Sequence, residues 1–408
     1  MLRFTTSSTS NLDINTLRVA LLNYIKSHQE STGFLLRIYD IDSSVEGEEQ
    51  ITIDILKKFA IDTENIFYQS KNLSIYQQMA KRLVDEDRAF ACFCNNSLEC
   101  SCESIAKETL QGRIANGEKF KLCIKKPLKD IRFKDNIQGE ITHKADEIGS
   151  FTILTSDGKP TTLFASAVDD MSNGITTVIE EVENSISTAK ILYLQEQFGY
   201  KSTTQYFHIP TLDNSKSKAP TIKYLLQEGY LPDAIIEYLL SLTAPIEKEI
   251  YYLPDAIESF DFSKIAKKSN RDFSLEELRE YNRKHLKNMD AKKLSSIFAF
   301  ADNDIGELLK LYLENAATIN ELEEYFRPLF KKKKCNDVEK ALSRLIIESP
   351  YFKEYESFKT YLLKKSNLSE KELEQALRNL LTGRNNGLNL DIIYNYLKSY
   401  ILEVAQCH

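Results

Sequence analysis

Hydrophobic and polar positions follow two different rhythms along the first half of the chain. Short apolar runs predict strands, at Phe34–Ile38, Ser150–Thr155 and Ile175–Glu180. Apolar residues spaced three or four positions apart predict helices, at Leu17–Ile25, Ile51–Phe59 and Ser74–Val84. Strands that alternate with helices in this way are typical of an α/β domain with a parallel sheet.

The second half of the chain has almost only the helical rhythm. From about Ile222 onward, apolar spacing of three and four predicts successive helices, at Leu231–Leu242, Leu275–Leu286, Ile319–Phe326 and Leu390–Ala405. Before this change, the block Ala89–Leu128 interrupts the α/β pattern and carries five of the seven cysteines. We therefore predict an α/β domain with an insertion, followed by a long all-helical region.

Length and composition set limits on the class of protein. The 408 residues are 42% hydrophobic, which is enough for two or three domains with their own cores. The net charge of −7 excludes a global basic field of the kind that drives non-specific nucleic-acid binding. The local run Lys331–Lys334 fits a solvated loop as well as a contact patch.

The chain lacks targeting and membrane signals. No apolar run approaches the ~18 residues of a membrane span, and no apolar core follows the first basic residue, as a signal peptide would require. We therefore expect a cytoplasmic protein without a membrane partner. In a reducing compartment, clustered cysteines indicate a metal site or free thiols rather than disulfides.

Residues 3–18, RFTTSSTSNLDINTLR, have the shape of a nucleotide-binding strand, turn and helix. A turn that binds phosphate usually needs glycine for close backbone approach. This turn offers Asp13, Asn15 and Thr16, with no glycine or histidine between Arg3 and Arg18. Asp13 also has a purely structural interpretation, because aspartate is a favoured cap at the start of a helix.

Five stretches in the same order resemble bacterial glutamyl-tRNA synthetase, a class I aminoacyl-tRNA synthetase. They are RFTTSSTSNLDINTLRVALLNYI at 3–25, FLLRIYDID at 34–42, SDGKPTTLFASAVDDMSNGITTVI at 156–179, SKSKAPTIKYLLQEGYLPDAIIEYLLSL at 215–242 and ALRNLLTGRNNG at 376–387. The resemblance implies an α/β fold: a Rossmann-type class I catalytic domain with an inserted connective domain, followed by an all-helical anticodon-binding-like domain. It also implies ATP-dependent activation of glutamate and transfer to tRNA.

The resemblance also implies where the domains lie. The Rossmann-type domain would occupy 1–88 and 150–210, and the inserted connective domain 89–149. A stem-contact region with a KMSKS-type loop would occupy 211–300, and the helical anticodon-binding-like domain 301–408. The implied partners are ATP and tRNA, with zinc as a second cofactor of the insertion.

The family's two catalytic motifs are altered in this chain. The histidine of the HIGH-type turn aligns with Asp13, and the two glycines align with Asn15 and Thr16. At ~4 Å and an effective dielectric of about 20, Asp13 and a phosphate would repel by roughly 4 kcal/mol. The KMSKS-like loop at 213–217 keeps Lys216 in the place of the second lysine, where it fits a phosphate contact or a surface lysine equally well.

Three positions of the glutamate pocket are also replaced. Tyr39 stands where the family has an acidic residue for the substrate ammonium, and Thr162 where it has a tyrosine. Glu180 stands where an arginine would pair with the substrate side-chain carboxylate, so attraction becomes like-charge repulsion. The retained positions are Arg3, Ser7, Arg37, Asp40, Asp42, Asp169 and Asp170. Two interpretations stay open: an unused pocket that closed, or a pocket rebuilt for another ligand.

The insertion holds a candidate metal site. Cys92, Cys94, Cys100 and Cys102 form a CxC–x5–CxC pattern, and two such pairs can build a tetrahedral thiolate site for zinc. Some members of the family carry zinc here, with a second ligand pair much later in the chain. Free cysteines also pack well as small apolar residues, so both interpretations stay open.

The helical region keeps several basic residues in stretches that match the family near tRNA. Lys284, Arg378 and Arg384 are the candidates for contacts with phosphates. The alternative is that these stretches form core packing and solvated helix faces.

Three functions are compatible with these residues. The first is a synthetase-related protein with degenerate ATP and glutamate sites, which binds tRNA or a protein of the translation machinery. The second is an ATP-dependent ligase with an altered, cationic or neutral substrate. The third is a glutamate–tRNA ligase that is still active through compensating residues.

Overall fold

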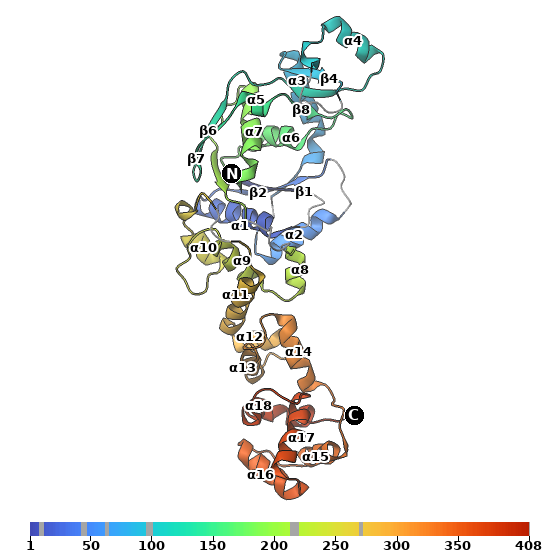
Figure 1. Cartoon of the computed structure of the whole chain (residues 1–408), viewed down its shortest axis with the longest axis vertical. Coiled ribbons are helices and arrows are strands. Elements are labelled where there is room, and N and C mark those ends of the chain that lie inside the picture. The colour runs from blue at the N-terminus through green and yellow to red at the C-terminus, as the bar shows by residue number, and fades with distance from the viewer. Residues whose placement is uncertain are drawn as a thin grey trace. The chain divides into compact units, whose positions relative to one another are not determined.

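The computed structural model describes residues 1–7, 12–41, 47–61, 65–94, 101–212, 220–268 and 272–407. The chain divides into two compact units. We call Met1–Tyr224 with Ile236–Ser274 the α/β unit, and Leu225–Ile235 with Leu275–His408 the helical unit. The predicted change from an α/β pattern to a helical one is confirmed (Figure 1).

A seven-stranded sheet forms the centre of the α/β unit. Its order is β3 (Ile66–Tyr68), β2 (Phe34–Tyr39), β1 (Leu2–Ser7), β9 (Thr177–Glu181), β10 (Gln205–Ile209), β6 (Ile131–Asp135) and β7 (Gly139–His143). Neighbouring strands are parallel except β6 and β7, which pair in antiparallel fashion. The predicted strands at 34–38 and 175–180 are β2 and β9.

The strand order reverses between β1 and β9. β1 pairs with β2 along its whole length, from Leu2 opposite Phe34 to Ser7 opposite Tyr39. With β9 it pairs only at Leu2 opposite Thr177, so the two strands separate toward their carboxyl ends. In open α/β sheets, ligands bind at such a switch point, outside the carboxyl ends of the strands.

Helices cover both faces of this sheet, with α6 and α7 on one face and α1 on the other (Figure 1). Helix α1 buries Leu17, Leu21 and Ile25, spaced four residues apart on the face toward the sheet. The helices that lie in this unit or begin in it are α1 (Ile14–Gln29), α2 (Glu48–Lys58), α3 (Leu73–Asp85), α4 (Lys107–Ala115), α5 (Ala145–Ile148), α6 (Thr162–Ser172), α7 (Ser185–Gln197), α8 (Ile222–Gln227) and α10 (Leu253–Ser259).

The segment between α3 and α6 contributes to two sheets. Strands β4 (Ala89–Cys92), β5 (Lys121–Ile124) and β8 (Phe151–Leu154) form a three-stranded antiparallel sheet. The hairpin β6–β7 from the same segment instead extends the main sheet, where Asp135 lies opposite Tyr206 of β10. The cysteine-rich block 89–128 therefore contributes its strands to the smaller sheet, whereas the hairpin that follows it belongs to the main sheet.

The helical unit is built around one apolar core. The helices that begin in it or lie in it are α9 (Pro232–Ser241, whose residues from Ile236 onward belong to the α/β unit), α11 (Leu275–Asn288), α12 (Ala291–Ser296), α13 (Asn303–Tyr312), α14 (Ile319–Phe330), α15 (Asp337–Ile347), α16 (Tyr355–Ser366), α17 (Glu370–Thr382), α18 (Leu390–Leu397) and α19 (Ile401–Val404). Within the residues that the structure describes, no helix has both the length and the apolar character needed to cross a membrane.

Two features of the helical unit correct the sequence analysis. The final helix predicted at 390–405 is interrupted, because a 3-10 turn at Lys398–Tyr400 separates α18 from α19. Cys335 and Cys407 form a disulfide, although the cysteines were expected to be reduced. The apolar rhythm continues across the 3-10 turn, so the pattern alone could not show the interruption.

Helices α12 and α13 meet at a glycine. A Cβ atom added at Gly306 would lie 1.9 Å from the backbone oxygen of Ala291. This spacing is far below van der Waals contact, so any side chain at 306 would push the two helices apart. The glycine is therefore required by the close approach of α12 to α13.

Candidate functional site

A cavity of about 400 Å³ opens where β1 and β9 separate. Its lining includes Arg3, Thr5, Arg37, Thr162, Glu180 and Glu181. These residues come from β1, β2, α6 and β9, so the cavity lies at the switch point of the sheet. It is the strongest candidate for a ligand site among the described residues of the α/β unit.

Two carboxylates hold Arg3 in this cavity. Its Nε and Nη2 donate to the two oxygens of Asp170 at 3.0 and 3.3 Å, and its Nη1 donates to Glu180 Oε1 at 2.6 Å. Burial works against the charge of Arg3, but Asp170 and Glu180 outweigh it and raise the pKa of Arg3. All three guanidinium nitrogens therefore already contact carboxylates of the protein.

Asp170 also binds a second buried guanidinium. Arg37 Nη1 donates to Asp170 Oδ1 at 2.6 Å, and Arg37 Nε donates to Thr5 Oγ1 at 3.1 Å. Burial alone would raise the pKa of Asp170, but Arg3 and Arg37 lower it. Because these residues come from β1, β2 and α6, the network fixes the wall of the cavity.

Asp169, the neighbour of Asp170, has a separate set of partners. Gln69 Nε2 donates to its Oδ2 at 2.6 Å, and the Tyr76 hydroxyl donates to its Oδ1 at 2.9 Å. Burial raises the pKa of Asp169, against the opposing effects of Arg37, Gln69 and Tyr76. The sequence analysis missed Gln69 and Tyr76, and no local motif marks them.

Glu181 lines the same cavity next to Glu180 and faces the fully buried Arg18 of α1. Arg18 Nη2 lies 3.9 Å from Glu181 Oε1, which is an ion pair without a hydrogen bond. Burial lowers the pKa of Arg18 to about 10 and raises the pKa of Glu181, although each charge partly offsets the effect on the other. Two adjacent carboxylates therefore face this cavity.

The turn before α1 is shaped by its own side chains. Asp13 caps α1, with a carboxylate oxygen accepting the Thr16 N–H at 2.7 Å, which confirms the structural interpretation of Asp13. Asn15 is buried, and its Oδ1 accepts the Leu212 N–H at 3.2 Å. Leu212 precedes the KMSKS-like loop, but Lys216 in that loop lies outside the described residues.

Of the other predicted pocket residues, some line the cavity and some do not. Thr162, the first residue of α6, lines the cavity. Ser7 and Tyr39 are opposite each other at the carboxyl ends of β1 and β2, and neither belongs to the cavity lining. Tyr39 packs against the apolar core of the unit instead. The structure therefore brings together Arg3, Thr162 and Glu180 from the predicted set.

Three of the four predicted thiol ligands converge. The sulfur atoms of Cys92, Cys94 and Cys102 all lie within 4.8 Å of one another, with Cys94 and Cys102 separated by 3.4 Å. Cys100 lies outside the described residues. Cys123 is buried nearby, with its sulfur 3.7 Å from Thr152 Oγ1. Three clustered thiols fit the donor set of a zinc site, which usually takes four ligands.

The three predicted tRNA contacts all lie in the helical unit. Arg378 Nη1 donates to the Leu388 carbonyl at 2.8 Å. Arg384 stacks on the Tyr325 ring at 4.2 Å and lines a second cavity of about 320 Å³. Lys284 lies over the Tyr281 ring at 5.8 Å. Each cation thus has an intramolecular contact that orients it.

A parallel sheet with a switch-point cavity, followed by a helical unit, is the architecture expected of a class I tRNA synthetase. The family model described as "tRNA synthetases class I (E and Q), catalytic domain" matches residues 1–99 and 96–280. The chain therefore belongs to this family, and the resemblance found in the sequence is confirmed.

Named relatives align with the chain from end to end. "Glutamate--tRNA ligase 2" of Sulfurovum sp. (strain NBC37-1) is 41% identical over 428 aligned positions, which cover 99% of this chain and 100% of the relative. "Glutamate--tRNA ligase 2" of Sulfurimonas denitrificans is 36% identical, with 100% of both chains covered. This chain is thus a glutamate–tRNA ligase-like protein.

Solved structures support the same fold. The crystal structure of the glutamate-tRNA synthetase from Elizabethkingia anophelis matches with a TM-score of 0.77 at 20% identity, covering 98% of this chain and 97% of that one. A glutamate tRNA ligase from Elizabethkingia meningosepticum matches with a TM-score of 0.78 at 20% identity over the same shares. The predicted fold class, an α/β synthetase domain followed by a helical region, is therefore confirmed.

Proposed function

We propose that this protein binds tRNA but does not activate glutamate by the ordinary chemistry of its family. The observation that carries the proposal is the 2.6 Å contact between Arg3 Nη1 and Glu180 Oε1. The Glu180 carboxylate accepts a hydrogen bond from the Arg3 guanidinium, which would otherwise be available to a carboxylate of the substrate. Glutamate would have to displace Glu180 or bind beside it.

The energetic consequence is large enough to matter. A substrate carboxylate ~4 Å from Glu180 would be repelled by roughly 4 kcal/mol at an effective dielectric of about 20. That repulsion corresponds to about a thousandfold loss of affinity. Glu181, on the same strand, adds to the unfavourable field. The cavity is therefore poorly suited to a dicarboxylic substrate.

The turn before α1 also disfavours the ordinary chemistry of the family, because it is poorly suited to ATP. A helix N-terminus attracts phosphate through its free N–H groups, but Asp13 already occupies the N–H of Thr16 and brings a negative charge. Asn15, in place of a glycine, is fixed to Leu212. In this proposal, Lys216 is the cation that the HIGH-type turn and the KMSKS-like loop still offer to the phosphates. ATP would therefore bind weakly.

The tRNA part of the proposal rests on the helical unit. In this proposal, residues 211–300 meet the tRNA stem and residues 301–408 the anticodon, as the resemblance implies. Lys284, Arg378 and Arg384 would contact tRNA phosphates. Arg378 and Arg384 each donate to a backbone carbonyl, and a guanidinium with one such bond keeps further N–H donors. The second type of partner in this proposal is a protein of the translation machinery. Zinc, held by Cys92, Cys94 and Cys102, would be a structural cofactor of the insertion.

A second candidate function is an active ligase, either for glutamate or for an altered substrate. The end-to-end match to relatives named glutamate–tRNA ligases favours the first form. The cavity of about 400 Å³ with Glu180 and Glu181 in its wall favours the second, with a cationic or neutral substrate. Both forms require ATP.

The deciding experiment combines two measurements on the purified chain. ATP–pyrophosphate exchange is measured with glutamate and bulk tRNA, and tRNA binding is measured by gel shift at several salt concentrations. Salt-dependent tRNA binding without exchange supports the proposal. Clear exchange with glutamate overturns it in favour of an active ligase, and the absence of tRNA binding overturns its RNA half.

A repair variant serves as the matched control. Asp13→His combined with Asn15→Gly and Thr16→Gly restores the residue types that the resemblance implies for the turn. Under the proposal, the natural chain is inactive because of both its turn and its pocket. The three substitutions combined with Glu180→Arg should therefore give a gain of ATP–pyrophosphate exchange activity. If the natural chain is already as active as the repaired one, the replacements are compensated elsewhere.

A further inference from the structure

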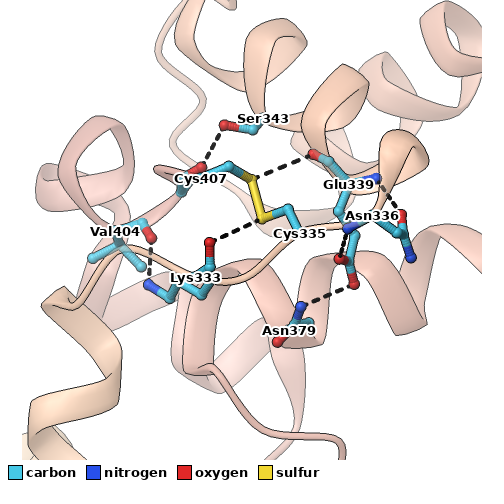
Figure 2. Close-up of a disulfide and its surroundings, with 9 residues drawn as sticks. Lys333, Cys335, Asn336, Glu339, Ser343, Asn379, Val404 and Cys407 are labelled. Atoms are coloured by element: carbon cyan, nitrogen blue, oxygen red, sulfur yellow. Dashed lines mark hydrogen bonds between the residues drawn. A yellow bond between two sulfur atoms is a disulfide. The ribbon is translucent and has the colours of Figure 1, made fainter.

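The disulfide Cys335–Cys407 closes a large part of the helical unit. The two cysteines are 72 residues apart, with Cα atoms separated by 5.8 Å. Cys335 precedes α15 and Cys407 follows α19, so the bond encloses helices α15 to α19. Figure 2 shows the bond with Lys333 and Val404 nearby, and Lys333 forms an isolated parallel bridge with Cys407.

Backbone and side-chain contacts converge on the same chain end. The N–H of Lys333 donates to the Gln406 carbonyl at 3.1 Å, which forms the bridge between Lys333 and Cys407. Ser343 Oγ donates to the Ala405 carbonyl at 2.6 Å. The residues 401–407, which we call the C-terminal segment, are thus attached at Ala405, Gln406 and Cys407.

Lys333 is the least expected partner of this segment. Its side chain is buried, and its ammonium donates to the carbonyl of Val404 (Figure 2) and to the carbonyl of Leu329. A buried ammonium is tolerated only with such partners, because its transfer from water is unfavourable. One of the two carbonyls that hold the Lys333 ammonium therefore belongs to the C-terminal segment.

The two cysteines themselves are accessible. Cys335 and Cys407 are only partly buried, whereas Val404 and Ala405 beside them are fully buried. Each of the two residues therefore has part of its surface exposed to solvent. The segment that depends on the bond, in contrast, fills part of that core.

We propose that Cys335 and Cys407 form a reversible redox site that fastens the C-terminal segment onto the helical unit. A dithiol reductant would attack one sulfur as a thiolate, break the Cys335–Cys407 bond and form a mixed disulfide. The second thiol of the reductant then closes its own disulfide, so two electrons and two protons pass to the cysteine pair. Reoxidation by a disulfide reagent reverses these steps.

Reduction changes what holds the segment in place. The covalent bond limits the segment to its native position, and without it the hydrogen bonds to Lys333 and Ser343 compete with water. We expect the segment to separate from the unit part of the time, with Val404 and the Lys333 ammonium exposed together. The oxidised form keeps both buried.

The test compares oxidised and reduced full-length protein. Protein equilibrated with oxidised glutathione is treated with or without dithiothreitol, and then exposed briefly to an amine-reactive ester and, separately, to a carboxypeptidase. Peptide mass spectrometry measures labelling of Lys333 relative to exposed Lys334. Reduction is expected to increase Lys333 labelling at least tenfold and to let the carboxypeptidase remove residues up to Ile401.

The double variant Cys335→Ser/Cys407→Ser is the matched control, since it keeps the cysteines of the insertion. It should behave as the reduced chain does, with or without dithiothreitol. Two results would overturn the proposal: no bond between Cys335 and Cys407 after oxidation, or equal Lys333 labelling and trimming in both redox states. If the double variant does not fold, the labelling of oxidised and reduced wild-type chain still decides.

Discussion

Glu180 Oε1 of β9 lies 2.6 Å from Arg3 Nη1 of β1, where the two parallel strands separate. Arg3 also donates to both oxygens of Asp170, so each of its three guanidinium nitrogens already contacts a carboxylate of the protein. Glu180 therefore does more than replace the arginine that the family has at this position. It occupies a cation that the resemblance places among the retained pocket residues.

This relationship predicts how the cavity responds to Glu180→Gln. Removal of the negative charge leaves Arg3 Nη1 with a weaker partner, so the affinity for an added carboxylate should rise by roughly tenfold or more. Glutarate is the best probe, because it carries two carboxylates and no ammonium that Glu180 or Glu181 could attract. Isothermal titration calorimetry at pH 7 measures the change.

Glu183→Gln is the control for this prediction. Glu183 is exposed and lies on the same segment, but it is not part of the cavity lining. Its substitution should leave glutarate affinity within about twofold. Equal glutarate binding by wild type and Glu180→Gln would show that Glu180 does not block Arg3.

A second prediction concerns the cap of α1. Asp13→Ala removes the acceptor of the Thr16 N–H and should lower the free energy of unfolding by about 1 kcal/mol. Asp13→Asn keeps an oxygen acceptor at the same position and should lower it by much less. Urea unfolding followed by circular dichroism measures both. A similar loss for both variants would mean that the charge of Asp13, and not its cap, stabilises the helix.

A third prediction concerns the thiol cluster. If Cys92, Cys94 and Cys102 hold zinc, then Cys94→Ser should reduce bound zinc to well below one equivalent, because a hydroxyl is a poor replacement for thiolate. Cys123→Ser should retain zinc, since its sulfur contacts Thr152 and lies outside the cluster of three. Elemental analysis of the purified variants measures metal content. Zinc-free wild-type protein, even after refolding with zinc, would favour packing of free thiols.

The sequence predicted the elements better than the contacts between them. Apolar spacing located β2, β9, α2 and α3 because each depends on residues close in the chain. The same rhythm continued through Lys398–Tyr400, where the chain forms a 3-10 turn, so the last helix was predicted as continuous. Local patterns contain no information about such an interruption when the apolar face is maintained.

The site shows the same limit. Comparison with the family identified Arg3, Thr162 and Glu180 separately, and the structure brings all three to one cavity. The ion pair between Arg3 and Glu180 joins residues 177 positions apart, and no sequence pattern indicated that they would meet. Likewise, the pairing of Cys335 with Cys407 could not be deduced from cysteine spacing.

The last prediction concerns the pH dependence that Lys333 gives to the helical unit. Burial lowers the pKa of Lys333 from 10.5 to about 8. Between these two values the unfolded chain binds a proton that the folded chain does not, so stability rises with pH. Between pH 8 and 10.5, the contribution of Lys333 to the free energy of unfolding rises by up to about 1.4 kcal/mol per pH unit. Below pH 8 this contribution is constant, because Lys333 is protonated in both states.

Lys333→Met removes this contribution, whereas Lys334→Met, at the exposed neighbouring lysine, should keep it. Urea unfolding of all three chains between pH 7.5 and 9.5, without reductant, measures the difference in unfolding free energy. Groups that titrate in all three chains, such as the buried tyrosines, cancel in this difference. The free energy of wild type relative to Lys333→Met should increase steadily with pH, and a flat or falling difference would show that the Lys333 ammonium keeps its proton when the unit is folded.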